Sequence, residues 1–502
     1  VAALIADKMR PGMILFSVVV LFLCAGILTP KEMLEGFSNK GMITVALLFL
    51  VSEGIRQSGT LGQVIKKLLP QGKTTVFKAQ LRILPSVAFI SAFLNNTPVV
   101  VIFAPIIKHW AKSVNLPATK FLIPLSYVTI LGGICTLIGT STNLVVHGMI
   151  LEAGFEGFSM FELGKVGIFI AIAGIIYIFL FSKRLLPDAR PDTAVPDEEV
   201  EEGEKLHRVE AVLGARFPGI NKKLKDFNFQ RHYGAEVKEI KTRNGQRFVS
   251  NLEEVVLHEG DTLVVMADDT FIPTWGESSV FVLLTNGNEP DTTGKKKRWF
   301  ALLLLVLMIV GATVGELPIT KEMFPDIKLD MFFFVSITTI IMAWTNLFPA
   351  RKYTKYISWD ILITIACAFA ISKAMVNSGV ADSVAKFIIG LSDDYGPHVL
   401  LAMVFIITNL FTELITNNAA AALAFPLALS ISAQLGVSPT PFFVVICMAA
   451  SASFSTPIGY QTNLIVQGIG NYKFTDFVRI GLPLNIITFL ISIILIPLIW
   501  NF

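Results

Sequence analysis

Asn, Thr and Ser side chains that could bind ions recur in two apolar parts of this chain at nearly the same spacing. The first set is NNTP at 95–98 and IGTSTNLVVHG at 138–148, and the second is TNNA at 416–419 and IGYQTNLIVQG at 458–468. Seven of the eleven positions in the two longer motifs are identical. Polar, Gly-containing breaks at matching places in two apolar halves are typical of the binding site of a secondary transporter.

The residue types in these motifs suit a cation and an anion together. Carbonyl groups and the oxygens of Asn, Ser and Thr are ligands that hard cations such as Na⁺ prefer. A helix that begins inside the membrane directs N–H groups and its positive dipole end at an anion. Helix packing is the alternative, because Gly, Ser, Thr and Asn also gather where membrane helices touch. Four motifs in twofold register favour a substrate and ion site over packing.

The motifs require helices that turn or break within the membrane. The apolar stretches beside 95–98 and 416–418 are too short to cross a bilayer separately, so we expect two re-entrant hairpins with these residues at their tips. Gly132-Gly133 and the serines between 451 and 455 predict unwound helix breaks ahead of the two longer motifs.

Composition places the chain in a membrane. Of its 502 residues 53% are hydrophobic and 16% charged, whereas soluble proteins carry about 25% charged residues. The net charge of +3 identifies no partner, and we expect no nucleic acid. The four Cys are isolated in apolar runs, which predicts neither a zinc site nor a disulfide framework. No phosphate loop or nucleophile elbow is visible, so we expect no enzyme. The chain begins with Val1, and we expect native residues to precede it.

Two membrane blocks enclose an insert of different composition. We expect a first membrane repeat at 1–184, an acidic linker at 185–205, a folded domain at 206–285, a second linker at 286–297 and a second membrane repeat at 298–502. The predicted fold is a polytopic α-helical membrane protein with two inverted repeats, each with a re-entrant hairpin and a broken helix. A small α+β cytoplasmic domain is inserted between the repeats.

Alternating apolar residues predict the structure of the insert. Strands are expected at 209–213, 235–240 and 261–266, with a hairpin turn at 244–245 and a short helix at 222–229. Basic residues flank the insert at 183–184 and 295–298, next to apolar segments. Because positive residues beside membrane spans mark the cytoplasmic side, we expect the insert in the cytoplasm and the protein in the inner membrane.

The paired motifs resemble those of the divalent-anion/sodium symporter family, within the wider ion-transporter superfamily, whose members carry Ser-Asn-Thr at each of two hairpin tips. The likeness covers both membrane blocks and is greatest to the sulfate-permease-like branch, where NNTPVV, IGTSTNLV, TNNAAAA and TPIGYQTNL-type strings recur. The insert resembles the C-terminal lobe of RCK regulatory domains, the TrkA-C type, at 224–229, 233–237 and 259–263.

The resemblance implies a homodimer in the lipid bilayer that works as an elevator, with a small-molecule or nucleotide ligand at the inserted domain. The substrate contacts that it implies are Asn96, Thr97, Thr142, Asn143, Asn417, Asn418, Thr462 and Asn463. The Na⁺ ligands that it implies are Asn95, Asn96, Gly139, Thr140, Asn143, Thr416, Asn417, Thr456, Gly459 and Asn463. Asn95 and Thr416 stand where the family has Ser, and Asn418 stands where it has Thr.

Four charged residues lie in apolar surroundings, where ionisable groups are often functional. Glu53 and Arg56 are three residues apart and share a helix face, so we expect them to pair. Lys373 occupies the repeat position equivalent to Glu53, and Glu413 lies three residues before the second tip, where it could take a proton. Snorkelling or internal pairing is the alternative for these residues.

Three hypotheses follow for the function. The first is a symporter that imports a small divalent oxyanion, sulfate first, together with Na⁺. The second keeps the fold but changes the cargo to a dicarboxylate or a sulfonate, or the coupling ion to H⁺. The third is a ligand-gated channel or sensor whose inserted domain reads a small molecule. The first is favoured because no Lys or Arg lies in the tip motifs, which suits a dianion bound together with Na⁺.

Overall fold

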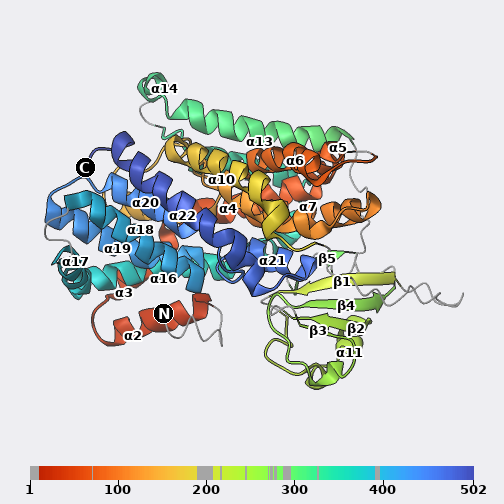
Figure 1. Cartoon of the computed structure of the whole chain (residues 1–502). Coiled ribbons are helices and arrows are strands. Elements are labelled where there is room, and N and C mark those ends of the chain that lie inside the picture. The colour runs from red at the N-terminus through yellow and green to blue at the C-terminus, as the bar shows by residue number, and fades with distance from the viewer. Residues whose placement is uncertain are drawn as a thin grey trace, which may run out of the picture.

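The computed structural model of this chain describes residues 11–70, 72–188, 207–214, 217–242, 246–268, 271, 275, 280–285, 295–324, 327–390 and 396–502. Its helices lie side by side in one bundle, and a small sheet lies at one end of that bundle (Figure 1). The helices that precede the sheet are α2 Pro11–Cys24, α3 Pro30–Glu35, α4 Lys40–Gln57, α5 Thr60–Leu68, α6 Val76–Ser91, α7 Asn96–Ser113, α8 Leu122–Gly133, α9 Ser141–Glu152 and α10 Gly164–Leu185.

The second helical block follows the sheet in the chain. Its helices are α13 Lys295–Gly315, α14 Pro318–Met323, α15 Met331–Trp344, α16 Trp359–Asn377, α17 Val380–Gly390, α18 Gly396–Leu414, α19 Asn417–Leu435, α20 Thr440–Ser451, α21 Gln461–Gly470 and α22 Phe474–Ile499. The two blocks pack together, because α10 lies against α22, α9 against α19 and α7 against α21.

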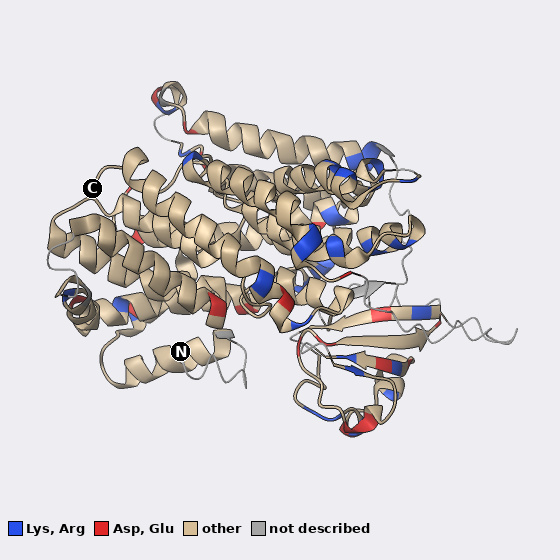
Figure 2. Cartoon of the chain, viewed as in Figure 1, with Lys and Arg blue, Asp and Glu red and all other residues tan. Residues whose placement is uncertain are grey.

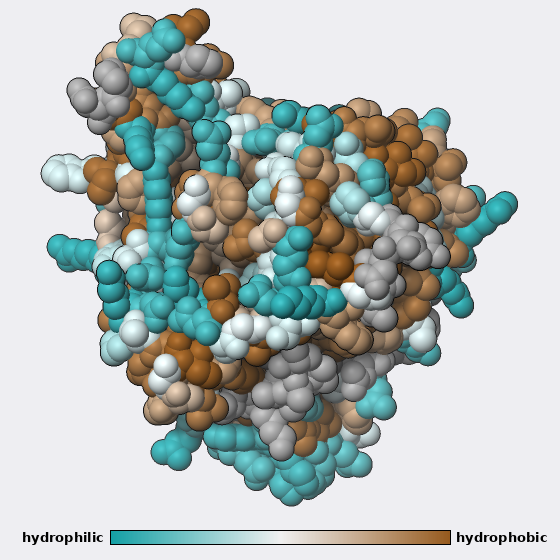
Figure 3. Space-filling view, turned by 90° about the vertical axis from the view of Figure 1, so that its left-hand side faces the viewer, coloured by the Kyte–Doolittle hydropathy of each residue, from teal (hydrophilic) through white to brown (hydrophobic). Residues whose placement is uncertain are grey.

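Long apolar helices make this chain a multi-pass membrane protein, as its composition predicted. Seven helices within the described residues are long and apolar enough to cross a membrane. On α22, Leu482, Ile486, Leu490 and Ile494 repeat at every fourth residue and are each at least half exposed. Such an outward apolar stripe suits contact with lipid. On the end of the bundle opposite the sheet, hydrophobic and hydrophilic residues are interspersed (Figure 3).

The helix breaks expected from Gly and Ser are confirmed. Helix α8 ends at Gly133 and α9 begins at Ser141, while α20 ends at Ser451 and α21 begins at Gln461. Close packing explains the glycines in the first break, because a methyl group added at Gly139 would lie 2.6 Å from the carbonyl oxygen of Gly133. The backbone therefore unwinds at matching places in the two blocks.

The second helical hairpin, formed by α18 and α19, is longer than we expected. The sequence predicted arms too short to cross a bilayer, but α18 and α19 each have 19 residues and the length and apolarity of a membrane span. The prediction was wrong because polar residues in α18 do not end the helix. Asn409 Nδ2 instead donates to the carbonyl oxygens of Ala449 and Ala452, at 3.3 and 2.6 Å, and Thr412 Oγ1 donates to that of Ala450.

The insert is a five-stranded antiparallel sheet in the order β3-β2-β4-β1-β5. Its elements are β1 His207–Leu213, α11 Phe229–Tyr233, β2 Glu236–Lys241, β3 Arg247–Phe248, β4 Thr262–Ala267 and β5 Phe281–Thr285. The three predicted strands are confirmed as β1, β2 and β4, whereas β3 and β5 were missed. The turn expected at 244–245 and the acidic run of the first linker lie outside the described residues.

Two boundaries in and after the insert differ from the predictions. The prediction of a helix at 222–229 is wrong, because a 3₁₀ turn covers Leu224–Asp226 and α11 begins only at Phe229. Asn228 caps α11 by accepting from the N–H of Arg231 at 3.0 Å, which sets this later start. Helix α13 begins at Lys295, inside the stretch predicted as a linker, because its first lysines continue the helix.

The sheet docks on α7 and α21, two of the helices that begin at the polar motifs. Lys108 of α7 donates to both carboxylate oxygens of Glu210 on β1, at 2.9 and 3.0 Å. On α21, a methyl group added at Gly468 would lie 2.5 Å from Thr262 Oγ1 of β4. Burial alone would raise the pKa of Glu210, but the ammonium groups of Lys108 and Lys241 lower it from 4.5 to about 2.

We expect Glu210→Gln to loosen the sheet domain, because it removes the carboxylate that pairs with Lys108 and Lys241 and leaves Lys241 only the more distant carboxylate of Glu239 at 3.9 Å. Breaking such a pair should raise the fraction of molecules in which the sheet domain is locally unfolded by about tenfold or more. Limited proteolysis of the insert at pH 7 should become faster by the same factor. Because the pKa of Glu210 is depressed in the folded state, its contribution is complete above pH 4.5 and is lost as the pH falls towards 2. Wild-type docking should therefore not change between pH 5 and 8.

Glu236→Gln is the matched control on the same sheet. Glu236 pairs with Lys238 at 2.7 Å, but both side chains are 54% exposed. Exposed pairs contribute roughly 0–1 kcal/mol, so this variant should be cleaved at the wild-type rate. Equal cleavage of Glu210→Gln and Glu236→Gln would contradict the docking role of Glu210.

Candidate functional site

Four helix N-termini are joined by hydrogen bonds in the interior of the bundle. Helices α7, α9, α19 and α21 begin at the predicted polar motifs, with Asn95, Thr140, Thr416 and Tyr460 at their N-cap positions. None of these four N-cap side chains caps its own helix. The first N–H groups of each helix have no intrahelical acceptor, so four sets of donors and four positive dipole ends belong to one site.

The first hairpin tip is bound to the second block through Tyr460. Asn96 is fully buried, and its Nδ2 donates to the hydroxyl of Tyr460 at 2.6 Å. The same hydroxyl lies 2.9 Å from Thr140 Oγ1. Asn96 Oδ1 accepts from Ser91 Oγ at 2.8 Å, and Thr97 Oγ1 donates to Gln461 Oε1 at 3.3 Å. The tip of one block is thus held by the broken helix of the other.

The second hairpin tip is bound to α9 of the first block. Asn417 Nδ2 donates to Thr142 Oγ1 at 2.6 Å. Thr142 Oγ1 and Ser141 Oγ in turn donate to Asn418 Oδ1, at 3.2 and 3.3 Å. Because Thr140 at the start of α9 also bonds to Tyr460, which holds the first tip, all four helix starts belong to a single hydrogen-bonded network.

Each block also contains the same three hydrogen bonds around its helix break. In the second block, Thr456 Oγ1 donates to the carbonyl oxygen of Glu413 and accepts from the N–H of Gly459, at 3.0 and 3.4 Å. Asn463 Nδ2 donates to the carbonyl oxygen of Thr456 at 3.2 Å. A threonine, a glycine and an asparagine therefore fix the path of the loop.

Thr136 makes the matching bonds in the first block. Its Oγ1 donates to the carbonyl oxygen of Ala92 and accepts from the N–H of Gly139, and its carbonyl oxygen accepts from Asn143 Nδ2 at 2.9 Å. The sequence analysis missed Thr136, although it precedes Thr456 by 320 residues, the same offset that separates Asn143 from Asn463. Extending the repeat alignment beyond the polar motif would have found it.

Not every predicted site residue points into the network. Thr462 Oγ1 and Asn463 Oδ1 both lie within hydrogen-bond distance of Ser126 Oγ on α8, at 2.8 and 2.7 Å. Thr462 therefore differs from its counterpart Thr142, which contacts the opposite tip. Asn143 Oδ1 and Thr416 Oγ1 are buried oxygens without a hydrogen-bond donor among the described residues. These two oxygens remain available as cation ligands.

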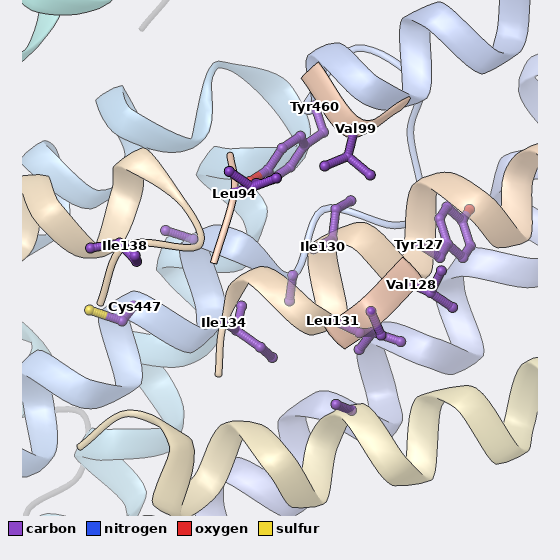
Figure 4. Close-up of a cluster of buried hydrophobic side chains, with 14 of the residues drawn as sticks. Leu94, Val99, Tyr127, Val128, Ile130, Leu131, Ile134, Ile138, Cys447 and Tyr460 are labelled. Carbon is purple, nitrogen blue, oxygen red and sulfur yellow. The ribbon is translucent and has the colours of Figure 1, made fainter. Parts of the chain in front are cut away.

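Apolar packing encloses the network. Leu94 and Val99, which flank the first tip, belong to the same hydrophobic cluster as Tyr460, Ile130 of α8 and Ile134 just after α8 (Figure 4). A small cavity beside the network is lined by Val45, Leu48, Ser52, Phe93, Asn95, Ile138, Ser141 and Leu144. The surrounding protein is of low dielectric, so the helix dipoles act more strongly here than in water.

The charged residues singled out in the sequence lie outside this network. Glu53 and Arg56 form the predicted pair, with Arg56 Nε and Nη2 donating to the two carboxylate oxygens at 2.7 and 2.6 Å. Glu413 Oε1 accepts from the N–H of Ser455 at 2.8 Å and from Asn485 Nδ2 at 2.7 Å. The partial positive charge of the network therefore comes from the helix N-termini and not from a basic side chain.

Comparison with known proteins agrees with a membrane transporter. A family model described as citrate transporter matches residues 1–430 and 327–501. An uncharacterized transporter of Synechocystis is 30% identical over 96% of this chain and 93% of its own length. A putative sulfur deprivation response regulator of Chlamydomonas reinhardtii is 28% identical over 95% and 96%. The probable sodium/sulfate cotransporter 3 of that alga is 23% identical over 96% of this chain and 85% of its own length.

Gly459→Ala tests how tightly the second break is packed. A methyl group at this position would overlap Ser453 Oγ and the backbone carbonyl oxygen of Thr412. Such overpacking costs about 1–3 kcal/mol, which we expect as a lower melting temperature of the purified protein. Gly390→Ala is the control, because a methyl group there meets no atom within 4 Å. Equal melting temperatures for the two variants would refute the close packing at Gly459.

Proposed function

Because this chain belongs to the citrate transporter family, we propose that it is a secondary transporter that carries a small divalent oxyanion, sulfate first, together with Na⁺. The observation that carries this proposal is the joining of four helix N-termini in one buried network. Each N-terminus presents about half a positive charge, so four present about +2. A dianion matches this charge without any Lys or Arg in the site.

The hydrogen bonds of the network suggest how the anion is taken up. In the structure, the Asn96 amide is bonded to Tyr460, and the Asn417 amide is bonded to Thr142. An anion between the tips would accept from these two amides and from the first N–H groups of the four helices. Binding would therefore exchange contacts within the protein for contacts to the substrate.

Na⁺ would balance the anion at two oxygen-rich places. The repeated Thr, Gly and Asn contacts at the two helix breaks support one cation beside each break, held by the ligands predicted from the sequence. Asn143 Oδ1 and Thr416 Oγ1, which lack a donor, are oxygens that a cation could use. The relative named as a probable sodium/sulfate cotransporter supports Na⁺ and sulfate together. The description of the matched family instead favours an organic carboxylate as the alternative cargo.

The same observations support two inverted repeats that form the site jointly. Matching hydrogen bonds surround the two breaks, and each hairpin tip contacts the broken helix of the other block. A site built from two repeats at the middle of the membrane is the arrangement that alternating access requires. We propose that a homodimer performs this movement as an elevator, with the hairpins and broken helices in the moving part.

The sheet is proposed to be a cytoplasmic domain of the RCK C-terminal type. Lys and Arg gather at the ends of the helices nearest the sheet (Figure 2). Positive residues at helix ends mark the cytoplasmic side, so these ends and the sheet would share that side. A ligand of the sheet domain could then influence α7 and α21 through the contacts at Glu210 and Thr262.

Sulfate uptake into proteoliposomes under an inward Na⁺ gradient tests the proposal. We expect saturable uptake that falls when choline replaces Na⁺. Asn96→Ala and Asn417→Ala each remove an amide that would donate to the anion, and a hydrogen bond to a charged group contributes about 1.5–3 kcal/mol. Each variant should therefore require roughly 10–100-fold more sulfate for half-maximal uptake.

Asn377→Ala is the matched control, because Asn377 Nδ2 donates to Ile27 and Glu32 away from the network. Its uptake should equal that of the wild type. Unchanged uptake by both Asn96→Ala and Asn417→Ala would contradict the site. Competition by citrate, succinate or taurine but not by sulfate would assign the alternative cargo, and uptake driven only by a pH gradient would replace Na⁺ with H⁺.

A further inference from the structure

Glu413 carries a buried carboxylate that the proposed anion and cation sites do not use. It lies in the last turn of α18, three residues before the second tip. Its Oε1 accepts from the N–H of Ser455 and from Asn485 Nδ2, as described above. Its Oε2 is buried and has no hydrogen-bond donor among the described residues. One oxygen of this carboxylate is therefore fixed and the other is left over.

Asn485 of α22 brings a second unpaired oxygen to the same group. Its side chain is buried, with the residue only 6% exposed, and its Nδ2 donates to Ser455 Oγ at 2.8 Å as well as to Glu413. Asn485 Oδ1 has no donor among the described residues. Three separate elements thus hold a carboxylate and an amide together in the interior: α18, α22 and the loop that precedes α21.

The charge of Glu413 has no counter-ion in its surroundings. Among the described residues, no Lys, Arg or His forms an ion pair with it, and α19 and α20 contain no Asp, Glu, Lys, Arg or His. Helix α22 contributes Asp476 and the exposed Arg479, and α18 itself contributes His398 near its start. The carbonyl groups at the C-terminus of α18 add partial negative charge beside the carboxylate. A buried negative charge in this position is either balanced by a cation or removed by a proton.

This group is absent from the first block. The residues that correspond to Glu413 and Ser455 by the repeat offsets are Ala92 and Cys135. Asn485 corresponds to Ala171, because Gly481 and Gly167 pack in the same way on the loops at Ser455 and Cys135. Neither packing nor ion binding shared by the two repeats can therefore explain it. The asymmetry indicates a function that only the second half of the site performs.

We propose that Glu413 Oε2 and Asn485 Oδ1 bind a Na⁺ ion, in addition to the cations proposed at the two helix breaks. A monovalent ion suits a site with one carboxylate, because divalent cations are held by more acidic ligands. The described residues contain no cluster of three or more His, Cys, Asp or Glu side chains that could hold a metal ion. The C-terminal end of a discontinuous helix is also a place where transporters coordinate Na⁺.

The ion would act on the second half of the anion site through the loop at 452–460. Glu413 holds this loop at two points, through its carboxylate at Ser455 N–H and through its backbone oxygen at Thr456 Oγ1. Thr456 in turn orders Gly459 and Asn463, directly before and within α21. Occupancy by Na⁺ would therefore set the position of the α21 N-terminus that faces the anion.

The inference rests on the proposed Na⁺ coupling, and binding of ²²Na⁺ to the purified full-length protein, measured by scintillation proximity without any anion, tests it directly. We expect Glu413→Gln to bind one Na⁺ fewer per chain than the wild type, or to bind with at least tenfold lower affinity. Glu413→Asp should retain part of the binding, because it keeps the carboxylate. Asn485→Ala should also lower the affinity for Na⁺, because it removes the second proposed ligand. This variant tests the site if Glu413→Gln fails to fold.

Asp382→Asn is the matched control, because Asp382 is an exposed carboxylate on α17 that accepts from Ser430. It should bind Na⁺ as the wild type does, and equal melting temperatures in choline chloride would show that the variants fold. Wild-type Na⁺ binding by Glu413→Gln would overturn the inference. Na⁺ binding that depends on Glu413 in a protein that does not transport sulfate would overturn the proposed substrate and leave this cation site standing.

Discussion

The constraint on which this structure depends is that four helices begin inside an apolar bundle. The first N–H groups of a helix have no intrahelical acceptor, and a lipid-like interior offers no water that could accept their hydrogen bonds instead. Asn95, Thr140, Thr416 and Tyr460 stand at the N-cap positions but do not cap their own helices. Their side chains leave the first N–H groups of these helices without a cap, which is what the proposed anion site requires.

The network is shared by the two halves of the chain rather than divided between them. The Asn96 tip depends on Tyr460, and the Asn417 tip depends on Thr142, so neither half forms a complete site. This pairing of each hairpin tip with the broken helix of the other block explains why the polar motifs are repeated. The repetition is nevertheless incomplete, since Thr462 turns to Ser126 while Thr142 faces a tip.

The sheet domain is placed where it can affect this network mechanically. It contacts α7 through Lys108 and α21 at Gly468, and both helices start at the hydrogen-bonded network. Helix α7 runs for 18 residues from Asn96 to Ser113, so Lys108 lies on the same helix as the first tip. A shift of the sheet would therefore displace helix starts without passing through flexible loops, which is how packed elements transmit small movements.

The sequence alone determined that the chain spans a membrane, that two polar motifs recur in register, and that the helices break beside them. These properties follow from apolar composition, local spacing and Gly or Ser content, which act over a few residues. Only the tertiary structure decided that Tyr460 bonds to Asn96, 364 residues away. It also decided that Asn485 joins Glu413 and that the arms of the second hairpin are long. Such contacts depend on how distant helices pack, and no local pattern encodes them.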